Sequence, residues 1–148
     1  MAEADVRTPD TTLRLTRTLA APRERVFRAF TDPEELIAWF GPSDDFKIPS
    51  AEVDLRVGGR YRIDLLDPSG NRLSVGGSYR EILRPERLVF TWQWEGNPEE
   101  TVVTIELAER AGRTELRLTH EGFAEAAQRD AHGDGWKGSF EKLARRVA

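Results

Sequence analysis

Hydrophobic and polar residues alternate with a period of two along much of the chain, the pattern of strands that bury one face. The first such segment is Thr12–Leu19, in which Leu13, Leu15 and Leu19 share one face with Arg17. We predict a strand there. The charged side chain on its apolar face is a break in the pattern that needs its own explanation.

A longer stretch of alternation covers residues 46–121 and is divided by turn signals such as Asp67-Pro68-Ser69-Gly70. Strands with this spacing pair as antiparallel hairpins, so we expect one continuous sheet. Gly76-Gly77 interrupts the strand Arg72–Leu83, which indicates a bulge or a sharp bend and therefore a strongly curved sheet. The expected inward face is apolar and aromatic, and its members are Tyr61, Ile63, Leu65, Leu88, Phe90, Trp92, Trp94, Val103, Ile105, Leu107, Leu116, Leu118 and His120.

Two short helices are expected between the first strand and this sheet. Pro22 suits the first turn of one helix because its missing N–H would be unbonded there. Asp32 is placed to cap the next helix. Glu35, three residues later, is placed to accept a hydrogen bond from the backbone N–H of Asp32, which would complete a capping box. Gly41-Pro42 ends that helix, since proline moves the preceding residue away from helical angles.

After Glu121 the period changes to that of a helix. Residues 124–132 are predicted to form a short link, either helical or irregular, with His132 at the surface or at a hinge, and Asp134-Gly135 introduces a final helix. The order β-α-α-β-α predicts a single α+β domain at 12–148, preceded by a flexible tail at 1–11. The apolar stripe of the final helix consists of Trp136, Phe140, Leu143 and Val147.

Composition narrows the classes of function. With 22 basic and 26 acidic residues the net charge is −4, so no positive field is available and nucleic acid is not expected as a partner. Cysteine is absent, which excludes disulfides, thiolate zinc sites and cysteine nucleophiles. The chain has no apolar run suited to a signal peptide or a membrane span, so we expect a cytoplasmic protein without membrane insertion, as a monomer or homodimer.

A helix that is apolar along one side needs a surface to cover it, and the aromatic face of the curved sheet is the surface available. We therefore expect the final helix to cross the concave side of the sheet, with a ligand cavity between the two. The alternative is that the rings simply fill a solid core. Candidate ligand-binding residues are Tyr61, Tyr79, Phe90, Trp92 and Trp94 on the sheet and Trp136 and Phe140 on the helix.

A set of motifs in a fixed order resembles a known family. They are APRERVF at 21–27, TDPEEL at 31–36, WFGP at 39–42, DLRVGGRY at 54–61, GSYREI at 77–82, PERLVFTW at 85–92 and the closing GW at 135–136. Together they are similar to the bacterial branch of the heat-shock-protein-90 ATPase activator-like proteins, within the START-related superfamily. The resemblance extends from about Leu13 to the end of the chain.

This resemblance implies the helix-grip (START or Bet v-like) fold, a curved antiparallel sheet around a long C-terminal helix. Members of the superfamily bind lipids, sterols or polyketides, and a few catalyse cyclisation or hydration in the cavity. The eukaryotic activators are co-chaperones of the stress response that carry an additional N-terminal domain. Our first hypothesis is a non-enzymatic binder of a small hydrophobic or amphipathic ligand. The alternatives are a protein-interaction module related to the chaperone activators, and a cyclase- or hydrolase-like enzyme with His120 as acid or base and Tyr61 or Tyr79 as proton donor.

Among the candidate residues, His120 has the strand parity of Leu116 and Leu118, which would aim its ring at the cavity as a general base or a ligand donor. The alternative is a histidine satisfied by a neighbour at the rim of the core. No His-x-x-x-His, paired aspartate or three-ligand cluster accompanies the two histidines of the chain, so neither a metal nor another cofactor is expected.

Arg17 and Trp39 each allow two interpretations. A guanidinium on an apolar face must be paired, either with a ligand carboxylate or with an acidic side chain, unless it reaches water. Glu81 is one such acidic residue, because its strand parity puts it on the same face as Tyr79. Trp39 ends the second short helix, where it would be a wall or gate of the cavity or else a plug that seals the core.

Overall fold

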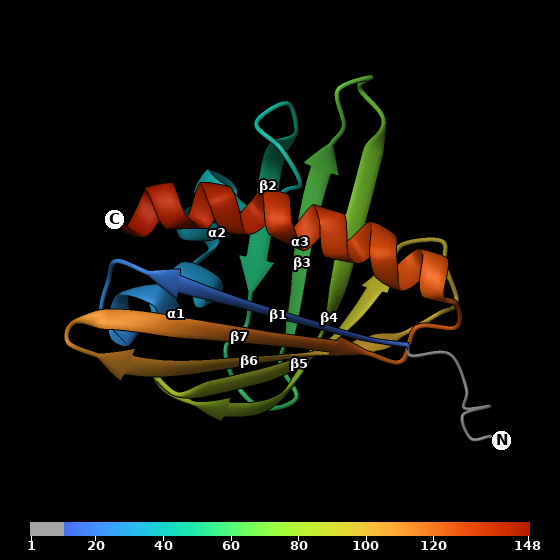
Figure 1. Ribbon diagram of the computed structural model, residues 1–148. Helices are drawn as coiled ribbons and strands as arrows, with labels where there is room; N and C mark the ends of the chain where they lie inside the picture. The colour runs from blue at the N-terminus through green and yellow to red at the C-terminus, as the bar shows by residue number, and fades with distance from the viewer. Residues whose placement is uncertain (1–10) are drawn as a thin grey trace, which may run out of the picture.

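The computed structural model describes residues 11–148. Its elements are β1 (Thr12–Leu19), α1 (Arg23–Thr31), α2 (Pro33–Trp39), β2 (Lys47–Val53), β3 (Arg60–Leu66), β4 (Arg72–Leu83), β5 (Arg87–Trp94), β6 (Thr101–Arg110), β7 (Arg113–Glu121) and α3 (Ala126–Val147). The strands form one antiparallel sheet in the order β1-β7-β6-β5-β4-β3-β2 (Figure 1). The predicted tail at 1–11 lies, apart from its last residue, outside the described residues.

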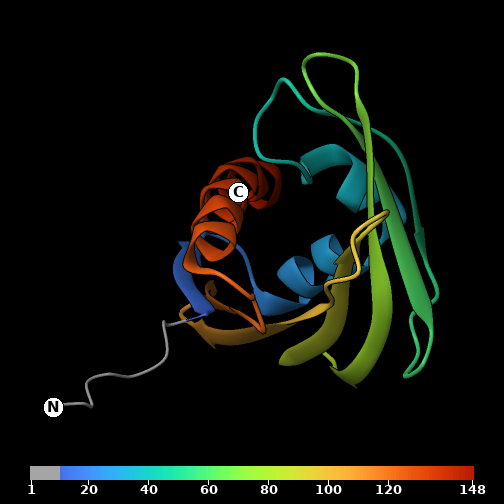
Figure 2. The same ribbon diagram turned by 90° about the vertical axis from the view of Figure 1, so that its right-hand side faces the viewer.

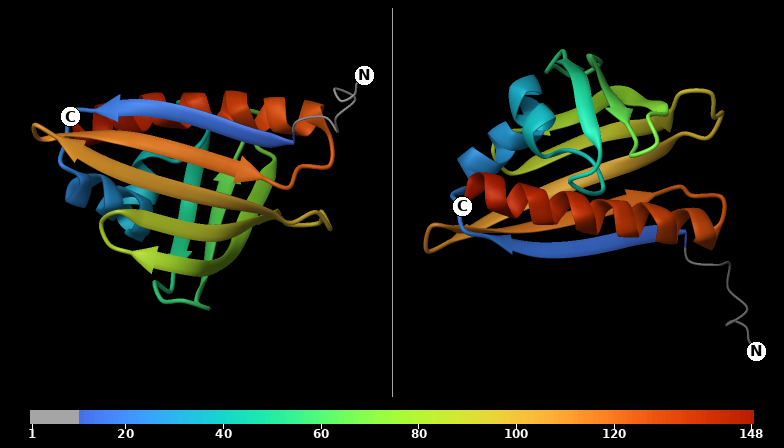
Figure 3. Two further views of the ribbon diagram at one scale, coloured as in Figure 1. Left: turned by 60° about the horizontal axis from the view of Figure 1, so that its bottom comes forward. Right: turned by 90° about the horizontal axis from the view of Figure 1, so that it is seen from above.

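The sheet curves around α3. This helix runs alongside β1 (Figure 1), and Figure 2, a view nearly along the helix, shows the sheet bending around it with α1 and α2 on the same concave side. The outer side of β1, β7, β6 and β5 carries no helix (Figure 3). The predicted α+β helix-grip fold is therefore confirmed. Within residues 11–148 no helix is long and apolar enough to cross a membrane.

The glycine pair in β4 allows the strand to approach its neighbours closely. A Cβ at Gly76 would lie 2.7 Å from the carbonyl oxygen of Tyr61, and one at Gly77 would overlap the carbonyl oxygen of Thr91. A side chain therefore fits at neither position, as expected for glycine at a close approach of two backbones.

A β-bulge further along β4 reverses which side chains face the core. The register against β5 shifts between Tyr79 and Glu81, so Ile82 packs against the core and Glu81 binds Arg87 at 3.0 Å instead. The prediction that Tyr79 and Glu81 share a face was wrong, because the bulge inserts one residue between them. Arg17 does not pair with Glu81: three strands lie between β1 and β4, and Glu81 binds Arg87.

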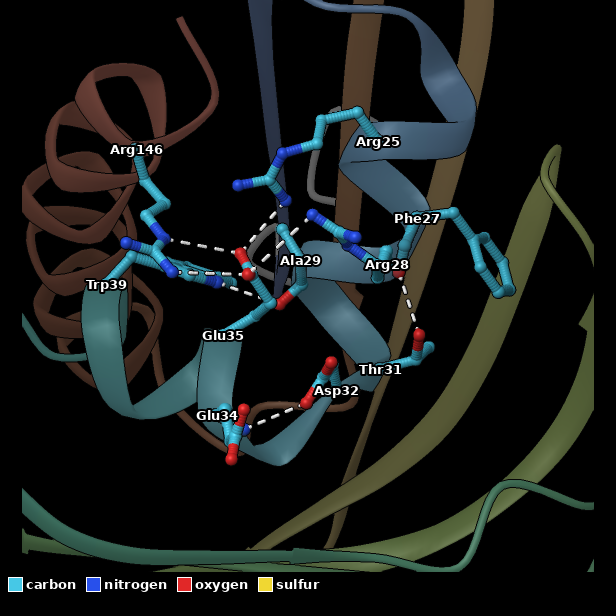
Figure 4. Close-up of polar contacts among 10 residues, drawn as sticks. All are labelled: Arg25, Phe27, Arg28, Ala29, Thr31, Asp32, Glu34, Glu35, Trp39 and Arg146. Atoms are coloured by element: carbon cyan, nitrogen blue, oxygen red, sulfur yellow. Dashed lines mark hydrogen bonds and ion pairs between the residues drawn. The ribbon is translucent and has the colours of Figure 1, made fainter.

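The cap of α2 confirms half of the capping-box prediction. The side chain of Asp32 accepts a hydrogen bond from the amide of Glu34 at 3.0 Å. Glu35 does not complete the box. Its carboxylate accepts hydrogen bonds from Arg25 at 2.9 Å and from Arg146 at 3.2 and 3.3 Å (Figure 4). Glu35 therefore links α1, α2 and α3 through charge.

Glu35 is buried, with 7% of its surface exposed. Burial opposes ionisation of the carboxyl, but the hydrogen bonds from Arg146 and Arg25 outweigh it and lower the pKa of Glu35. Arg28 contributes a third guanidinium at 3.9 Å. The carboxylate is thus held in the charged state by the residues that it joins.

The final helix starts earlier than its apolar stripe indicates. It begins at Ala126, so the link at 124–132 takes its helical alternative from that residue on, and the predicted start near Asp134 was wrong. Glycine lowers helix propensity, which is why Gly133 and Gly135 suggested a boundary. Packing outweighs that cost, because α3 lies against other elements over most of its length.

Glycines in α3 have different surroundings. A Cβ at Gly138 would overlap the carbonyl oxygen of Pro42, while one at Gly135 would lie 4.0 Å from the ring of Pro42. The first glycine lets the helix touch the backbone of the segment after α2. The second leaves open space beside the helix.

Substitution of these glycines tests that difference. We expect Gly138→Ala to lower the free energy of unfolding by about 2 kcal/mol or more, because the methyl group displaces a backbone carbonyl. Gly135→Ala should instead raise it by about 0.5–1 kcal/mol, because the helix gains propensity and nothing is displaced. Urea unfolding measures both values, and a gain in both variants would contradict the close contact at Pro42.

Neutralising the buried carboxylate tests the link between the helices. Glu35→Gln should lower the free energy of unfolding by about 2 kcal/mol, less than for a fully buried pair because Arg146 is about half exposed. Glu34→Gln, at the exposed neighbouring position, is the matched control and should change stability by less than about 0.5 kcal/mol. Similar losses in the two variants would show that the cluster adds nothing beyond surface charge.

Candidate functional site

A pocket of about 240 Å³ lies where α3, the segment after α2 and the end of β5 meet. Aromatic and small residues make up most of its wall, and none of the Asp, Glu, Lys and Arg residues within 11–148 lines it. Its volume is below the roughly 300–1,000 Å³ of pockets that hold drug-sized ligands, so it suits a smaller molecule. The lining residues are Phe40, Gly41, Pro42, Leu65, Trp92, Trp94, Ala131, His132, Gly135, Trp136 and Ser139.

Behind this pocket lies an inner hollow of only about 20 Å³. Phe40, Trp92 and Trp136 line both spaces and so form the partition between them. Their rings pack at centroid distances of 5.1–6.3 Å. The inner part of the concavity is therefore close to the solid core that was the alternative expectation, and the usable space lies at one end.

The predicted ligand-binding residues differ in whether they line the pocket, the inner hollow, both or neither. Trp92 and Trp136 line both the pocket and the hollow, Trp94 lines the pocket alone, and Phe140, His120 and Arg17 line neither. Phe140 is buried against the ring of Trp136. The remaining four line the inner hollow and not the pocket, and they are Trp39, Tyr61, Tyr79 and Phe90.

Trp39 has the environment of a plug. Its side chain is fully buried, and its indole N–H donates to the carbonyl oxygen of Ala29 at 2.8 Å (Figure 4). An indole held in this way at the junction of α1 and α2 closes the core.

His120 is fully buried on β7, and both of its ring nitrogens are engaged. The indole N–H of Trp136 donates to Nδ1 at 3.1 Å, so the proton of the neutral ring is on Nε2, which lies 2.7 Å from the hydroxyl oxygen of Thr101. Burial, with a further contribution from the neighbouring His132, lowers the pKa of His120 to about 3. The ring is neutral near pH 7, and neither nitrogen is left for a substrate.

His132 forms a second indole–imidazole pair. Trp94 donates its indole N–H to Nε2 of His132 at 2.9 Å, so Nδ1 carries the proton and donates to the carbonyl oxygen of Gln128 at 2.8 Å. His132 therefore belongs to α3 and to the pocket wall, so the predicted surface or hinge position was wrong. The two imidazole rings lie 5.4 Å apart.

Trp92 lies among these rings but has no such partner. Its indole Nε1 is closed to solvent and, within residues 11–148, makes no hydrogen bond. The ring of Trp92 lies 5.4 Å from that of His120 and 5.1 Å from that of Trp136. A buried donor without a partner costs about 1–3 kcal/mol, so Trp92 is an exception among otherwise satisfied rings.

The tyrosines do not complete a catalytic group with His120. Tyr61 donates its hydroxyl to the carbonyl oxygen of Thr91 at 2.6 Å, and burial raises its pKa well above the ordinary value. Burial also raises the pKa of Tyr79. Both phenols line the inner hollow, whereas His120 does not, so the convergence of ionisable groups that an acid–base site needs is not present there.

Arg17 reaches an acidic partner on the helix. Its guanidinium binds Glu141 of α3 at 3.0 Å, and about a third of its side chain is exposed. Hydrogen bonding to Arg17 lowers the pKa of Glu141. The partner of Arg17 is thus a carboxylate of the protein itself, so Arg17 gives no reason to expect an anionic ligand.

A larger hollow of about 580 Å³ lies on the opposite face of the sheet. Glu52, Arg62, Gly76 and Gln93 are neighbours in register across it, and the missing side chain of Gly76 leaves the depression. Arg62 already binds Asp64 at 3.0 Å. Because polar and charged residues make up most of its lining, this hollow is a weaker candidate for an apolar ligand than the aromatic pocket.

Sequence reasoning missed the helix side of the pocket. Ala131, Gly135 and Ser139 recur at intervals of four, so they form a stripe of small residues on one face of α3. This spacing was visible in the sequence, but the expected helix boundary at Gly135 hid it. Among residues 11–148, no group of three or more His, Cys, Asp or Glu side chains could hold a metal ion.

Buried neutral His120 predicts a loss of stability in mild acid. The pKa of its ring is lower in the folded protein than the ordinary value of 6.5, so its contribution to stability is complete above that value and falls as the pH drops toward 3. Between pH 7 and pH 5 we expect the free energy of unfolding to fall by roughly 2 kcal/mol.

Two histidine variants isolate this effect. Urea unfolding at pH 7 and at pH 5 measures the free energy of unfolding of each variant. His120→Gln should remove most of the difference between pH 7 and pH 5, while His132→Gln should keep it. An equal pH dependence in His120→Gln and the unmodified protein would show that another group causes it.

Comparisons with known proteins agree with this architecture. Protein CV1439 from Chromobacterium violaceum is 36% identical to this chain, covering 93% of it and 96% of its own length, with a TM-score of 0.85. DynU16, a putative protein in the dynemicin biosynthetic locus, shares the fold at 24% identity and a TM-score of 0.77, over 93% of this chain and 47% of its own. An HSP90 activator from Plasmodium falciparum is 29% identical over 75% of this chain and 72% of its own, with a TM-score of 0.59.

No match was found among curated proteins. The family model described as Activator of Hsp90 ATPase homolog 1-like protein matches residues 20–148, which includes every helix of the described chain and all of its strands but β1. The motifs that carried the resemblance fall within this match. The chain therefore belongs to the family of Activator of Hsp90 ATPase homolog 1-like proteins.

Proposed function

We propose that the protein binds a small, mainly apolar molecule in the pocket between α3, the segment after α2 and β5. The observation that carries the proposal is the wall itself, in which aromatic rings face a stripe of small helix residues across about 240 Å³. Removing water from such an apolar surface lowers the free energy, so the pocket favours binding of an apolar molecule of matching size. The pocket requires no ionisable group, and binding without turnover is the activity that it supports.

A second candidate is a protein-interaction role, which the similarity to an HSP90 activator favours. Surfaces for such a role would come from exposed apolar side chains. Among the described residues these belong to separate segments: Ile37 on α2, Leu55 and Val57 between β2 and β3, and Leu73 and Leu83 on β4. The pocket is the more concentrated apolar feature, so it ranks first. A cytoplasmic location stays a prediction.

Filling the pocket from the helix tests the proposal. Gly135→Leu places a side chain where the nearest atom to a new Cβ is 4.0 Å away, so the leucine extends into the pocket without displacing backbone. With naphthalene as the probe, we expect binding by the unmodified protein and a loss of affinity of more than about tenfold in Gly135→Leu. Isothermal titration calorimetry measures both affinities.

Asp134→Leu is the matched control, because it adds the same side chain at the exposed neighbouring position. It should bind naphthalene like the unmodified protein. Absence of binding in the unmodified protein, or equal affinity in Gly135→Leu, would overturn the assignment of this pocket. Native mass spectrometry of the purified protein, followed by denaturing extraction, then identifies any molecule that it retains.

A further inference from the structure

Three arginines surround the buried carboxylate of Glu35. Arg25 and Arg28 belong to α1, and Arg146 lies near the end of α3 (Figure 4). Within residues 11–148, the ion pairs of these arginines are all with Glu35, at 2.9 Å for Arg25, 3.9 Å for Arg28 and 3.2 Å for Arg146. One negative charge thus faces three positive charges, so this cluster carries an excess of positive charge.

Acidic side chains on the neighbouring elements do not balance this excess. Glu24 of α1 binds Arg84 at 2.6 Å, and Asp44, in the segment after α2, binds Arg145 at 2.9 Å. Glu34 of α2 points away from the three arginines (Figure 4). The positive surface is therefore a local feature of a chain whose net charge is −4.

Two of the arginines keep N–H groups at the surface. Arg28 lies too far from Glu35 for a hydrogen bond, and 53% of its side chain is exposed. Arg146 donates from Nε and from one Nη to Glu35, and 45% of its side chain is exposed. Because a guanidinium has five N–H donors in a planar fork that matches a carboxylate, both side chains can bind further carboxylates.

The position of Glu35 restricts what can bind there. Its carboxylate occupies the point where the three guanidinium groups converge, so a single small anion would meet that negative charge. Figure 4 shows Arg28 and Arg146 on opposite sides of the carboxylate. Two separate negative groups, one on each side, fit this arrangement, and neighbouring acidic residues of a peptide supply them. A long polyanion such as nucleic acid would also meet the net negative charge of the rest of the chain.

We propose that the three arginines form a docking surface for an acidic segment of a partner protein, whose carboxylates bind Arg28 and Arg146 on either side of Glu35. Glu35 is the positioning residue, because its hydrogen bonds hold Arg25 and Arg146 in place. The surface lies about two turns of α3 beyond Ser139, which lines the pocket. The proposal is independent of ligand binding in the pocket, and its failure would leave the proposed function unchanged.

A short acidic peptide tests the docking surface. Hexaglutamate is the probe, and hexaglutamine is its uncharged control. We expect hexaglutamate to bind the unmodified protein at low salt, and Arg28→Gln to raise its dissociation constant about fivefold, because a charged donor is lost while every hydrogen bond to Glu35 is kept. Arg80→Gln is the matched control and should keep the affinity, since Arg80 is 55% exposed and lies 3.8 Å from Glu100. Titrations followed by nuclear magnetic resonance measure these constants.

A second measurement on the unmodified protein does not depend on the variants. In ¹H–¹⁵N spectra the Nε–H signals of Arg28 and Arg146 should move when hexaglutamate is added, whereas that of Arg80 should stay in place. Absence of binding, equal binding of hexaglutamine, or equal losses in Arg28→Gln and Arg80→Gln would overturn the proposal. Tighter binding of inorganic phosphate or of oligothymidylate at these arginines would also overturn it, and would assign the surface to a small oxyanion or to nucleic acid.

Discussion

The contact between α3 and the segment that follows α2 is the constraint on which the pocket depends. Gly138 lacks the Cβ that would strike the carbonyl oxygen of Pro42, so the helix and this backbone touch directly. Ser139 donates to the carbonyl oxygen of Gly41, and Lys142 donates to that of Phe40 at 3.0 Å. These bonds satisfy carbonyl groups that a helix end leaves unpaired, and they hold Phe40 across the end of the concavity. Without these hydrogen bonds the distance between this segment and the sheet would not be fixed. The volume between Phe40 and Trp92 would then not be fixed either.

The aromatic cluster behind that contact has to reconcile packing with hydrogen bonding. An indole ring brings a large apolar surface into the core but also an N–H that needs an acceptor. The fold supplies one histidine for each of two indoles, His120 for Trp136 and His132 for Trp94. This pairing fixes the tautomer of both imidazoles, and at His120 it makes protonation unfavourable, because a second proton on Nδ1 would face the donor of Trp136. The buried histidine thus acts as an acceptor that the tryptophan requires, which explains its position on an apolar strand face without assigning it any chemistry.

Much of the architecture was accessible from periodicity, whereas the partners of individual polar groups were not. Alternation identified β1 and the inward face of the sheet, and the sequence around Asp32 located the start of α2, because these signals are local. Arg17 was correctly expected to need a partner. Its partner Glu141 is more than a hundred residues away along the chain, and no local pattern connects them. The bulge in β4 moved Glu81 to the other face, since one inserted residue inverts the parity on which such an assignment depends.

The position of the pocket follows from the sizes of the side chains that face each other. Toward the inner end, rings such as Tyr61 and Phe90 meet other rings, and little space is left. Toward the outer end, Trp92 and Trp94 face the stripe of small residues on α3, and glycine at position 135 leaves open space beside the helix. Glycine in a helix interior lowers stability by about 0.5–1 kcal/mol relative to alanine. At position 138 the backbone of Pro42 leaves room for glycine alone. At position 135 a methyl group would fit, so the neighbouring atoms do not require glycine there. Selection for stability alone would favour a larger residue there, so glycine at this position supports the proposal that a small molecule binds in the space beside it.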